Sequence, residues 1–323
     1  IAVSDKGTIA AVTPRGISLI TPKEITLQQK ADHYDEMAVK YFTRNEGYQV
    51  DRILRKYGDL DSGWLPNSDN DGLFTGLYCA SQCFRYAATG EKEAKENAKR
   101  AVEAMIKLTE VTGKSGFTAR ATRYTDDPYF GTGNREEWHV CKDNPECEWL
   151  GETSSDEMTG HFFGFSLYYD FCADKKEKEF IKEIICDIVD HIIEHKYRLH
   201  DIDDKPTTWA CWDPDELNGK SMWLWEKCIN SLEILTFLNV AYHMSGDEKY
   251  RKEFLRLAYD NHYLLNAAQP KKDDARVCHI DDNLGFLCTT TFLRLEKDPA
   301  IRAYILMGLH QHWEYERTER NPF

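Results

Sequence analysis

The chain has 323 residues, a formal net charge of −14, 41% hydrophobic residues and 12% aromatics, which is typical of a globular protein with one large domain or two ordinary ones. No apolar run reaches about 18 residues, so a membrane-spanning helix is not expected. No cluster of Lys and Arg stands clear of nearby acids, and the acidic balance therefore argues against nucleic acid or an anionic membrane as a partner.

Residues 1–20 are expected to form a short β segment, with strands over 8–12 and 17–20 joined by a turn at Pro14 and Gly16. One interpretation is that this segment is the end of a preceding module. Residues 21–323 are expected to form one helical domain. Its first helix is predicted over 24–42, because Thr21 and Glu24 have the spacing of a helix cap.

From residue 69 onward the sequence repeats one unit, an apolar helix followed by a tight turn and a charged, amphipathic helix. In two of the turns a glycine, Gly90 or Gly246, is placed to end the helix in the left-handed conformation. Four such hairpins are predicted, over 71–89 with 91–111, 156–173 with 175–195, 228–245 with 247–265, and 282–297 with 299–314.

The two helices of each unit differ in their polarity. Residues 160–169 are apolar nearly all round, which requires other helices on every side, whereas residues 91–100 keep their apolar side chains on one stripe. An alternation of inner and outer helices predicts an α/α toroid. The alternative is an open α-solenoid of the tetratricopeptide type, which the long and irregular spacing between the units disfavours.

Two long connections, residues 112–153 and 196–227, interrupt the repeat, and connections of that length usually carry function or disorder. They contain six of the eight tryptophans, which argues against disorder. Ten cysteines occur without a Cys-x-x-Cys pair, so no zinc ribbon or redox motif is predicted. Cys141 and Cys147 bracket a short loop that a disulfide would close in an oxidising compartment.

Acidic residues begin three of the four predicted inner helices. Each one alone is explained by helix capping or by the helix dipole, but here the acids come in twos, which favours a functional site. The N-termini of the inner helices meet at one mouth of a toroid, so these carboxylates are expected to converge. They are Asp69 and Asp71, Asp156 and Glu157, and Asp281 and Asp282.

Glu157 and His161 are four residues apart, so both side chains project from one face of their helix, near Gly160 and Gly164. The alternative is that the glycines permit close helix packing and His161 belongs to the core. A zinc-protease helix is excluded, because no His-Glu-x-x-His motif occurs and no other histidine is expected at ligand spacing with an acid. The hydrolase interpretation includes no metal and no cofactor. In the first long connection, Arg120 is expected to hold a substrate carboxylate or sulfate, and Arg135 to form an ordinary ion pair.

The inner and outer hairpins, the helix starts at 69–72 and 154–157 and the tryptophan-rich loops resemble the six-hairpin α/α-toroid glycosidases, in particular bacterial enzymes that degrade complex polysaccharides. The resemblance covers about residues 60–316. Only four hairpins and a leading helix are visible, so either 48–57 and the long connections hide helices or the ring is incomplete. The resemblance implies a periplasmic or extracellular glycoside hydrolase acting on an oligosaccharide or polysaccharide, including one that contains uronic acid.

Glycoside hydrolysis needs one protonated carboxylic acid and one carboxylate that acts as base or nucleophile. Glu157 is the expected acid, since Met158 and Phe162 beside it would raise its pKa, and Asp71 is the expected base or nucleophile. Asp156 and Asp282 are the further catalytic candidates. The expected substrate-binding residues are Asp69, Arg120, His161, Trp64, Trp138, Trp149, Trp209, Trp212 and His279.

Two other functions stay open at this point. A polysaccharide lyase would neutralise a uronate with Arg120 and use His161 or a tyrosine as base. A non-catalytic glycan-binding or scaffold module would use the paired acids as caps, with a calcium site at Asp69 and Asp71. A zinc-dependent relative would need a Cys/His triad, and Cys278 and His279 offer only two members.

Overall fold

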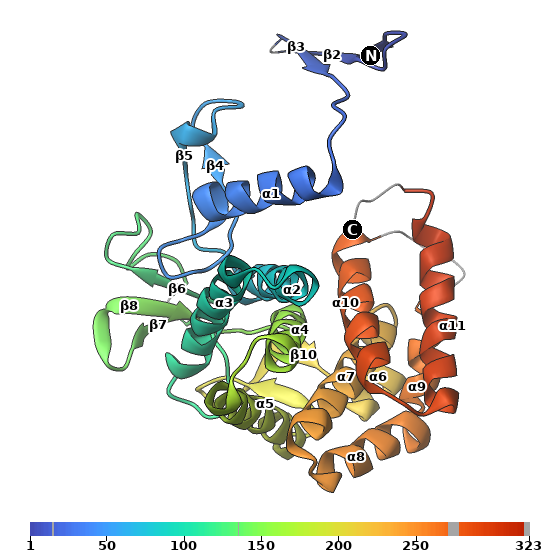
Figure 1. Ribbon diagram of the computed structural model, residues 1–323. Coiled ribbons are helices and arrows are strands. Elements are labelled where there is room, and N and C mark those ends of the chain that lie inside the picture. Colours follow the sequence, from blue (N-terminus) through green and yellow to red (C-terminus); the bar gives the residue numbers. More distant parts are fainter. Residues whose placement is uncertain (15, 135, 271–277, 320–323) are drawn as a thin grey trace. The chain divides into compact units, whose positions relative to one another are not determined.

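The computed structural model describes residues 1–14, 16–134, 136–270 and 278–319, apart from the side chain of residue 280. The chain divides into two compact units, Ile1–Phe42 and Thr43–Phe323 (Figure 1). None of the described helices is both long enough and apolar enough to span a membrane.

The first unit contains a three-stranded antiparallel sheet and one helix. The sheet consists of β1 (Ala2–Val3), β2 (Ile9–Thr13) and β3 (Gly16–Ile20), which confirms both predicted strands. The helix α1 (Leu27–Met37) continues into the π-helical turn η1 (Ala38–Phe42). It begins after Thr26, whose side chain accepts from Gln29 N–H while the Gln29 side chain caps Thr26. The predicted cap at Thr21 is therefore wrong, because the reciprocal cap lies five residues later.

The second unit contains the four predicted helical hairpins, with most of their ends within three residues of the expected positions. Gly90 and Gly246 adopt left-handed φ angles of 73° and 67° and end their helices as expected. The hairpins are α2 (Asp71–Thr89) with α3 (Lys92–Glu110), α4 (Ser155–Phe171) with α5 (Lys175–Glu194), α7 (Lys227–Ser245) with α8 (Glu248–Leu255), and α10 (His279–Leu295) with α11 (Pro299–Glu316).

The outer helix of the third hairpin is broken, although the sequence predicts it as continuous over 247–265. After α8 the chain forms a π-helical turn, η4 (Arg256–Asp260), and then the short helix α9 (Tyr263–Ala267). Between them His262 has a φ angle of 60°, a left-handed conformation that a continuous right-handed helix cannot contain.

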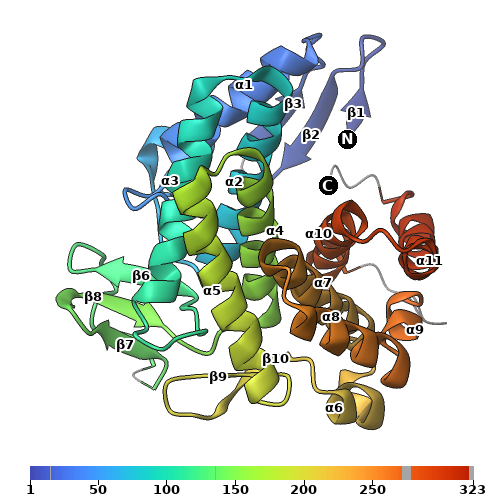
Figure 2. The same cartoon turned by 60° about the horizontal axis from the view of Figure 1, so that its bottom comes forward.

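The inner helices are α2, α4, α7 and α10, and they pack in series: α2 on α4, α4 on α7 and α10, and α7 on α10. Figure 2 shows α2, α3, α4 and α5 side by side, with the outer helices against the inner ones. Among the described residues α2 and α10 do not pack closely on each other, so the four hairpins form an arc. The structure thus gives a mostly helical fold of inner and outer helices without showing a closed six-hairpin ring.

The two long connections form small sheets in place of the missing hairpins. Residues 48–57 likewise contain a strand and no helix. Of the segments in which the sequence allows hidden helices, the second connection alone contains an α-helix among the described residues, the six-residue α6, and none contains a further helical hairpin. Their β-branched and aromatic residues, such as Thr122 and Val140, favour strands. The elements are β4 (Ile53–Leu54), η2 (Leu60–Ser62), β5 (Gly63–Trp64), β6 (Ala121–Tyr124), β7 (Trp138–Cys141), β8 (Asn144–Leu150), β9 (Arg198–His200), β10 (Pro206–Cys211), α6 (Pro214–Gly219) and η3 (Ser221–Trp223).

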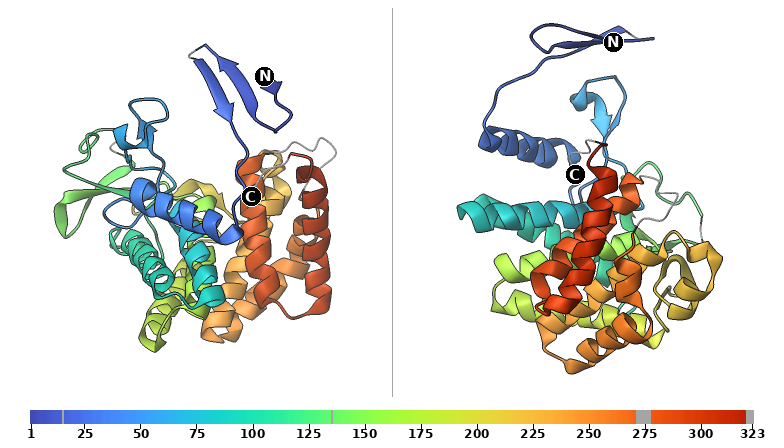
Figure 3. Two further views of the ribbon diagram at one scale, coloured as in Figure 1. Left: turned by 45° about the horizontal axis from the view of Figure 1, so that its top comes forward. Right: turned by 90° about the vertical axis from the view of Figure 1, so that its right-hand side faces the viewer.

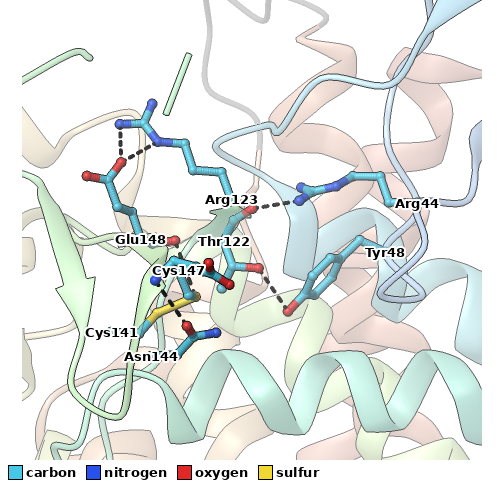
Figure 4. The surroundings of a disulfide bond; sticks show 9 residues. Arg44, Tyr48, Thr122, Arg123, Cys141, Asn144, Cys147 and Glu148 are labelled. Carbon is cyan, nitrogen blue, oxygen red and sulfur yellow. Dashed lines mark hydrogen bonds and ion pairs between the residues drawn. A yellow bond between two sulfur atoms is a disulfide. The ribbon is translucent and has the colours of Figure 1, made fainter. Parts of the chain in front are cut away.

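A disulfide joins Cys141 to Cys147 across the hairpin of β7 and β8 (Figure 4). In the same antiparallel sheet, whose strand order is β6-β8-β7, the guanidinium of Arg123 forms a buried ion pair with Glu148 at 2.8 Å. Arg44 donates from Nη2 to the carbonyl oxygen of Thr122 at 2.8 Å. These contacts fix the sheet beside the start of α2, where the first predicted acids lie.

Candidate functional site

Helices α2 and α4 cross at glycines, which lets their backbones touch. A Cβ added at Gly76 would overlap the carbonyl oxygen of Gly160, and a Cβ at Gly160 would overlap Leu73. Gly164 in turn lies against the backbone of Gly76. The close-packing interpretation of Gly160 and Gly164 is therefore confirmed.

Glu157 lies inside this helix crossing and is fully buried. Its Oε1 accepts a hydrogen bond from Leu73 N–H at 3.2 Å, and its Oε2 occupies the space beside Gly72 that a Cβ would fill. Burial raises the pKa of Glu157 well above its usual range, and the negative charge of Asp156 raises it further. Burial therefore favours the protonated form of this side chain, which packs between two helices.

His161 is buried in the same crossing. Its Nδ1 lies 2.8 Å from the carbonyl oxygen of Glu157, so Nδ1–H donates and the ring is held one turn along the helix. Burial lowers the pKa of His161 to about 4, which keeps the imidazole neutral. Its edge packs on Phe165, with ring centroids 5.7 Å apart.

Asp71 is fully buried at the start of α2. Its Oδ2 forms an ion pair with Nη1 of Arg44 at 2.9 Å, and its Oδ1 accepts from Ser68 N–H at 3.0 Å. Burial raises the pKa of Asp71 to about 8, against the opposing effect of Arg44. Asp71 therefore ties the chain before α2 to the helix.

The N-termini of α4, α7 and α10 surround one cavity of about 260 Å³. Three carboxylates line it, Asp156 from α4, Glu226 from the residue before α7, and Asp281 from α10. Arg120 and the exposed Trp209 line the same cavity. The remaining lining residues are Ser154, Ser155, Trp223, Ile229, Asn230 and Leu284. Of the acids predicted to converge, Asp156 and Asp281 line this cavity, whereas Asp69 and Asp71 at the start of α2 are absent from its lining.

The start of α2 is joined to this cavity through hydrogen bonds. Arg120 donates from Nε to the carbonyl oxygen of Asp69 at 2.7 Å, and its Nη2 lies 3.5 Å from Oδ2 of Asp69. In the amide orientation that satisfies its neighbours, the side-chain nitrogen of Asn70 donates to Oδ2 of Asp156 at 3.0 Å. The Arg120 guanidinium is thus held in position beside Asp156.

Two acids at or near the third inner helix, Glu226 before α7 and Glu233 within it, are absent from the predicted set. Burial raises the pKa of Glu226, and the negative charge of Asp281 raises it further. The sequence predicts this helix from Cys228, two residues after Glu226, so Glu226 is not among the predicted acids. Glu233 lies one layer deeper, and its charge in an otherwise apolar helix was the signal that could have identified it.

Glu233 is fully buried and held by two donors. Trp212 donates from Nε1 to Oε2 at 2.9 Å, and Thr159 donates from Oγ1 to Oε1 at 3.1 Å. Burial raises the pKa of Glu233 to about 8, although both hydrogen bonds lower it. Glu233 is therefore a buried carboxylic acid, mostly protonated at neutral pH, in the core behind the cavity.

The predicted tryptophans separate into exposed and buried groups. Trp209 is 58% exposed and lines the cavity, whereas Trp149 and Trp212 are buried and present no open face. The guanidinium of Arg123 covers one face of Trp138, 3.6 Å from the ring centroid. Trp64 lines a different cavity, of about 540 Å³, together with Arg44 and Tyr129. Arg135 lies outside the described residues.

Asp282 and His279 point toward α11. Oδ1 of Asp282 lies 2.7 Å from Nε2 of His312, and Nδ1 of His279 lies 3.3 Å from Oε2 of Glu316. The ligand atoms of Asp282, His312 and Glu316 all lie within 4.8 Å of one another and could hold a metal ion. His312 and Glu316 are not among the residues predicted from the sequence, although they are four residues apart and therefore lie on one helix face.

No family model and no curated protein matches this chain. Among solved structures, the cellobiose 2-epimerase from Spirochaeta thermophila DSM 6192 is similar, with a TM-score of 0.47 and 13% sequence identity. The match covers 91% of this chain and 72% of that chain. Similarity at this level carries no substrate or reaction over to the chain.

Proposed function

We propose that this chain is a carbohydrate-active enzyme, a glycoside hydrolase whose reaction takes place in the cavity at the starts of α4, α7 and α10. The observation that carries the proposal is the lining of that cavity by Asp156, Glu226 and Asp281 together with the exposed Trp209. A pair of carboxyl groups supplies the acid and the base or nucleophile of glycosidic cleavage, and an exposed indole supplies an apolar surface for a sugar ring.

Glu226 is the general acid in this proposal. Its pKa is raised by burial and by Asp281, so it keeps its proton at a higher pH than an ordinary glutamic acid and can donate it to the leaving oxygen. Asp156 is the base or nucleophile. Its carboxylate accepts from Glu157 N–H at 3.0 Å, from the Asn70 amide and from the Ser154 hydroxyl, and these bonds fix its orientation.

The acid role thus moves from Glu157 to Glu226 in the proposal, because Glu157 packs between helices and is absent from the lining of the cavity. Asp71 has a corresponding supporting role through its ion pair with Arg44. Both side chains support the backbone at the starts of α2 and α4, from which Asn70 and Asp156 project.

A polysaccharide lyase is the second candidate, and Arg120 is the observation that favours it. Arg120 lines the cavity and could pair with a uronate or sulfate, so the proposed substrate includes acidic as well as neutral polysaccharides. A lyase also needs a base, however. His161 lies in the helix crossing, and no histidine or tyrosine is among the described residues that line this cavity. Hydrolysis is therefore preferred.

The proposal needs no cofactor and no nucleic acid or membrane partner. It places the protein in the periplasm or outside the cell, where an oxidising environment would maintain the disulfide between Cys141 and Cys147.

The test is a panel of neutral and uronic plant and algal polysaccharides, assayed both for new reducing ends and for near-ultraviolet absorbance. Hydrolysis produces reducing ends without absorbance, whereas elimination produces an unsaturated sugar that absorbs. Because elimination also leaves a reducing end, the result that supports the proposal is new reducing ends without absorbance, which are lost in Asp156→Asn. Unsaturated products would favour the lyase, and glycan binding without any product after long incubation would contradict an enzyme.

A further inference from the structure

A cluster of metal-ligand side chains lies between α10 and α11, the neighbouring helices coloured orange-red and red in Figure 3. Asp282 is in the first turn of α10, and His312 and Glu316 are one turn apart near the end of α11. These three residues are only 2%, 4% and 8% exposed. Their ligand atoms lie within 4.8 Å of one another, which is close enough for all three to reach one ion.

A fourth donor adjoins the cluster. Nδ1 of His279, from the first residue of α10, lies 3.3 Å from Oε2 of Glu316. His279 is 46% exposed, so an ion could reach the cluster from this side. The donor set then consists of two imidazoles and two carboxylates.

The surroundings hold the two central ligands in place. Oδ2 of Asp282 accepts from Cys278 N–H at 2.9 Å, which turns Oδ1 toward His312. The imidazole of His312 stacks on Phe286, with ring centroids 4.5 Å apart. A Cβ at Gly285 would lie 2.8 Å from Cε1 of His312, so this glycine makes room for the ring. Such outer contacts orient the ligands of metal sites.

We propose that Asp282, His312 and Glu316 bind one divalent ion of the zinc class, with His279 as the fourth ligand. Imidazole and carboxylate donors suit Zn²⁺, whereas Ca²⁺ and Mg²⁺ prefer oxygen donors alone. A divalent ion between two buried carboxylates also places a positive charge beside both of them, which favours their ionised forms.

The ion has a structural role next to the cavity. It joins the first turn of α10 to the last turns of α11, and the residue before Asp282 is Asp281, which lines the cavity. The metal therefore fixes the position of Asp281 without contacting a substrate. The site does not depend on the proposed function, since the cluster would bind its ion whatever the cavity does.

The test measures zinc binding and leaves enzymatic activity aside. The chelator-treated full chain is titrated with Zn²⁺ against a chromophoric chelator, and the melting temperature is recorded with and without the ion. We expect one equivalent of Zn²⁺ to bind with submicromolar affinity and to raise the melting temperature. Asp282→Asn keeps an acceptor for Cys278 N–H, and we expect it to weaken binding by at least about 100-fold, as is also expected for His312→Gln.

The matched control is His195→Gln. Its imidazole lies between those of His191 and His200, with ring centroids 4.2 Å and 4.4 Å away, and this second group of histidines could also attract zinc. The control should bind Zn²⁺ as the unmodified chain does. If Asp282→Asn fails to fold, Glu316→Gln replaces it. The proposal is overturned if the unmodified chain takes up no Zn²⁺, or if the His195 variant alone loses it.

Discussion

The indole N–H of Trp212 donates to Oε2 of Glu233 at 2.9 Å, and this pair joins the connection after β10 to the middle of the inner helix α7. Trp212 is fully buried and its only ring N–H is used in this bond, so its ring has no face exposed to a ligand. The pair instead stabilises the core behind the cavity. The exposed Trp209, three residues earlier, lines the cavity.

Glu233 makes stability depend on pH in a direction that can be measured. Burial raises its pKa from 4.5 to about 8 in the folded chain, so between these values the folded state holds a proton that the unfolded state has lost. Stability therefore falls as the pH rises from about 4.5 to 8, with a slope of up to ~1.4 kcal/mol per pH unit from this one group. Glu233→Gln should flatten the fall in melting temperature between pH 5 and pH 8. An equally steep fall in the variant would show that Glu233 is not the cause.

The glycine crossing of α2 and α4 predicts a large penalty for a single methyl group. Gly160→Ala forces a Cβ into Leu73, so we expect unfolding in urea to show a loss of about 1–3 kcal/mol. Gly219→Ala is the matched control, because a Cβ there meets no atom within 4 Å and the glycine has no left-handed φ. Equal stability of the two variants would mean that the helices are farther apart than the structure has them.

The variant Glu157→Gln tests whether Glu157 is a buried packing residue or the general acid. Burial raises the pKa of Glu157 and favours its neutral form, and glutamine has nearly the same shape, so turnover should stay within a few-fold of the unmodified chain. Measured turnover on the substrate found in the panel decides the matter. A loss of 10²- to 10⁴-fold, the usual contribution of a general acid, would return that role to Glu157.

The stacking role of Trp209 predicts an effect on binding. Trp209→Ala removes the open indole face beside the carboxylates, so KM should rise about tenfold with kcat little changed. Trp225→Ala is the control, because Trp225 is 57% exposed and is absent from the lining of the cavity. A rise in KM for Trp225→Ala alone would place the sugar elsewhere.

The sequence was sufficient for the hairpins because their signals are local. Apolar periodicity sets the span of α2, and Gly90 marks its end through a φ angle that few other residues adopt. The sheets in the long connections were missed because their strands are short and pair across many residues. Thr122, for example, pairs with Trp149, and neither segment alone indicates the other.

The site was only partly predictable, for two physical reasons. An aromatic side chain can pack in a core or stack on a ligand, and the sequence does not distinguish the two uses. The buried Trp149 and the exposed Trp209 therefore could not be told apart from the sequence. Adjacent acids at a helix start also point in different directions. Asp156 lines the cavity while Glu157 enters the helix crossing, and Asp281 lines it while Asp282 faces His312.

The most direct test of the proposed reaction compares three charge-removing variants on the substrate found in the panel. Asp156→Asn and Glu226→Gln remove carboxylates from the cavity, whereas Glu183→Gln removes an exposed one from the outer helix α5. We predict that kcat falls by at least about 100-fold in the first two variants, as expected for groups that act in acid–base or nucleophilic catalysis, and is unchanged in the third. Full turnover in both Asp156→Asn and Glu226→Gln would contradict the account.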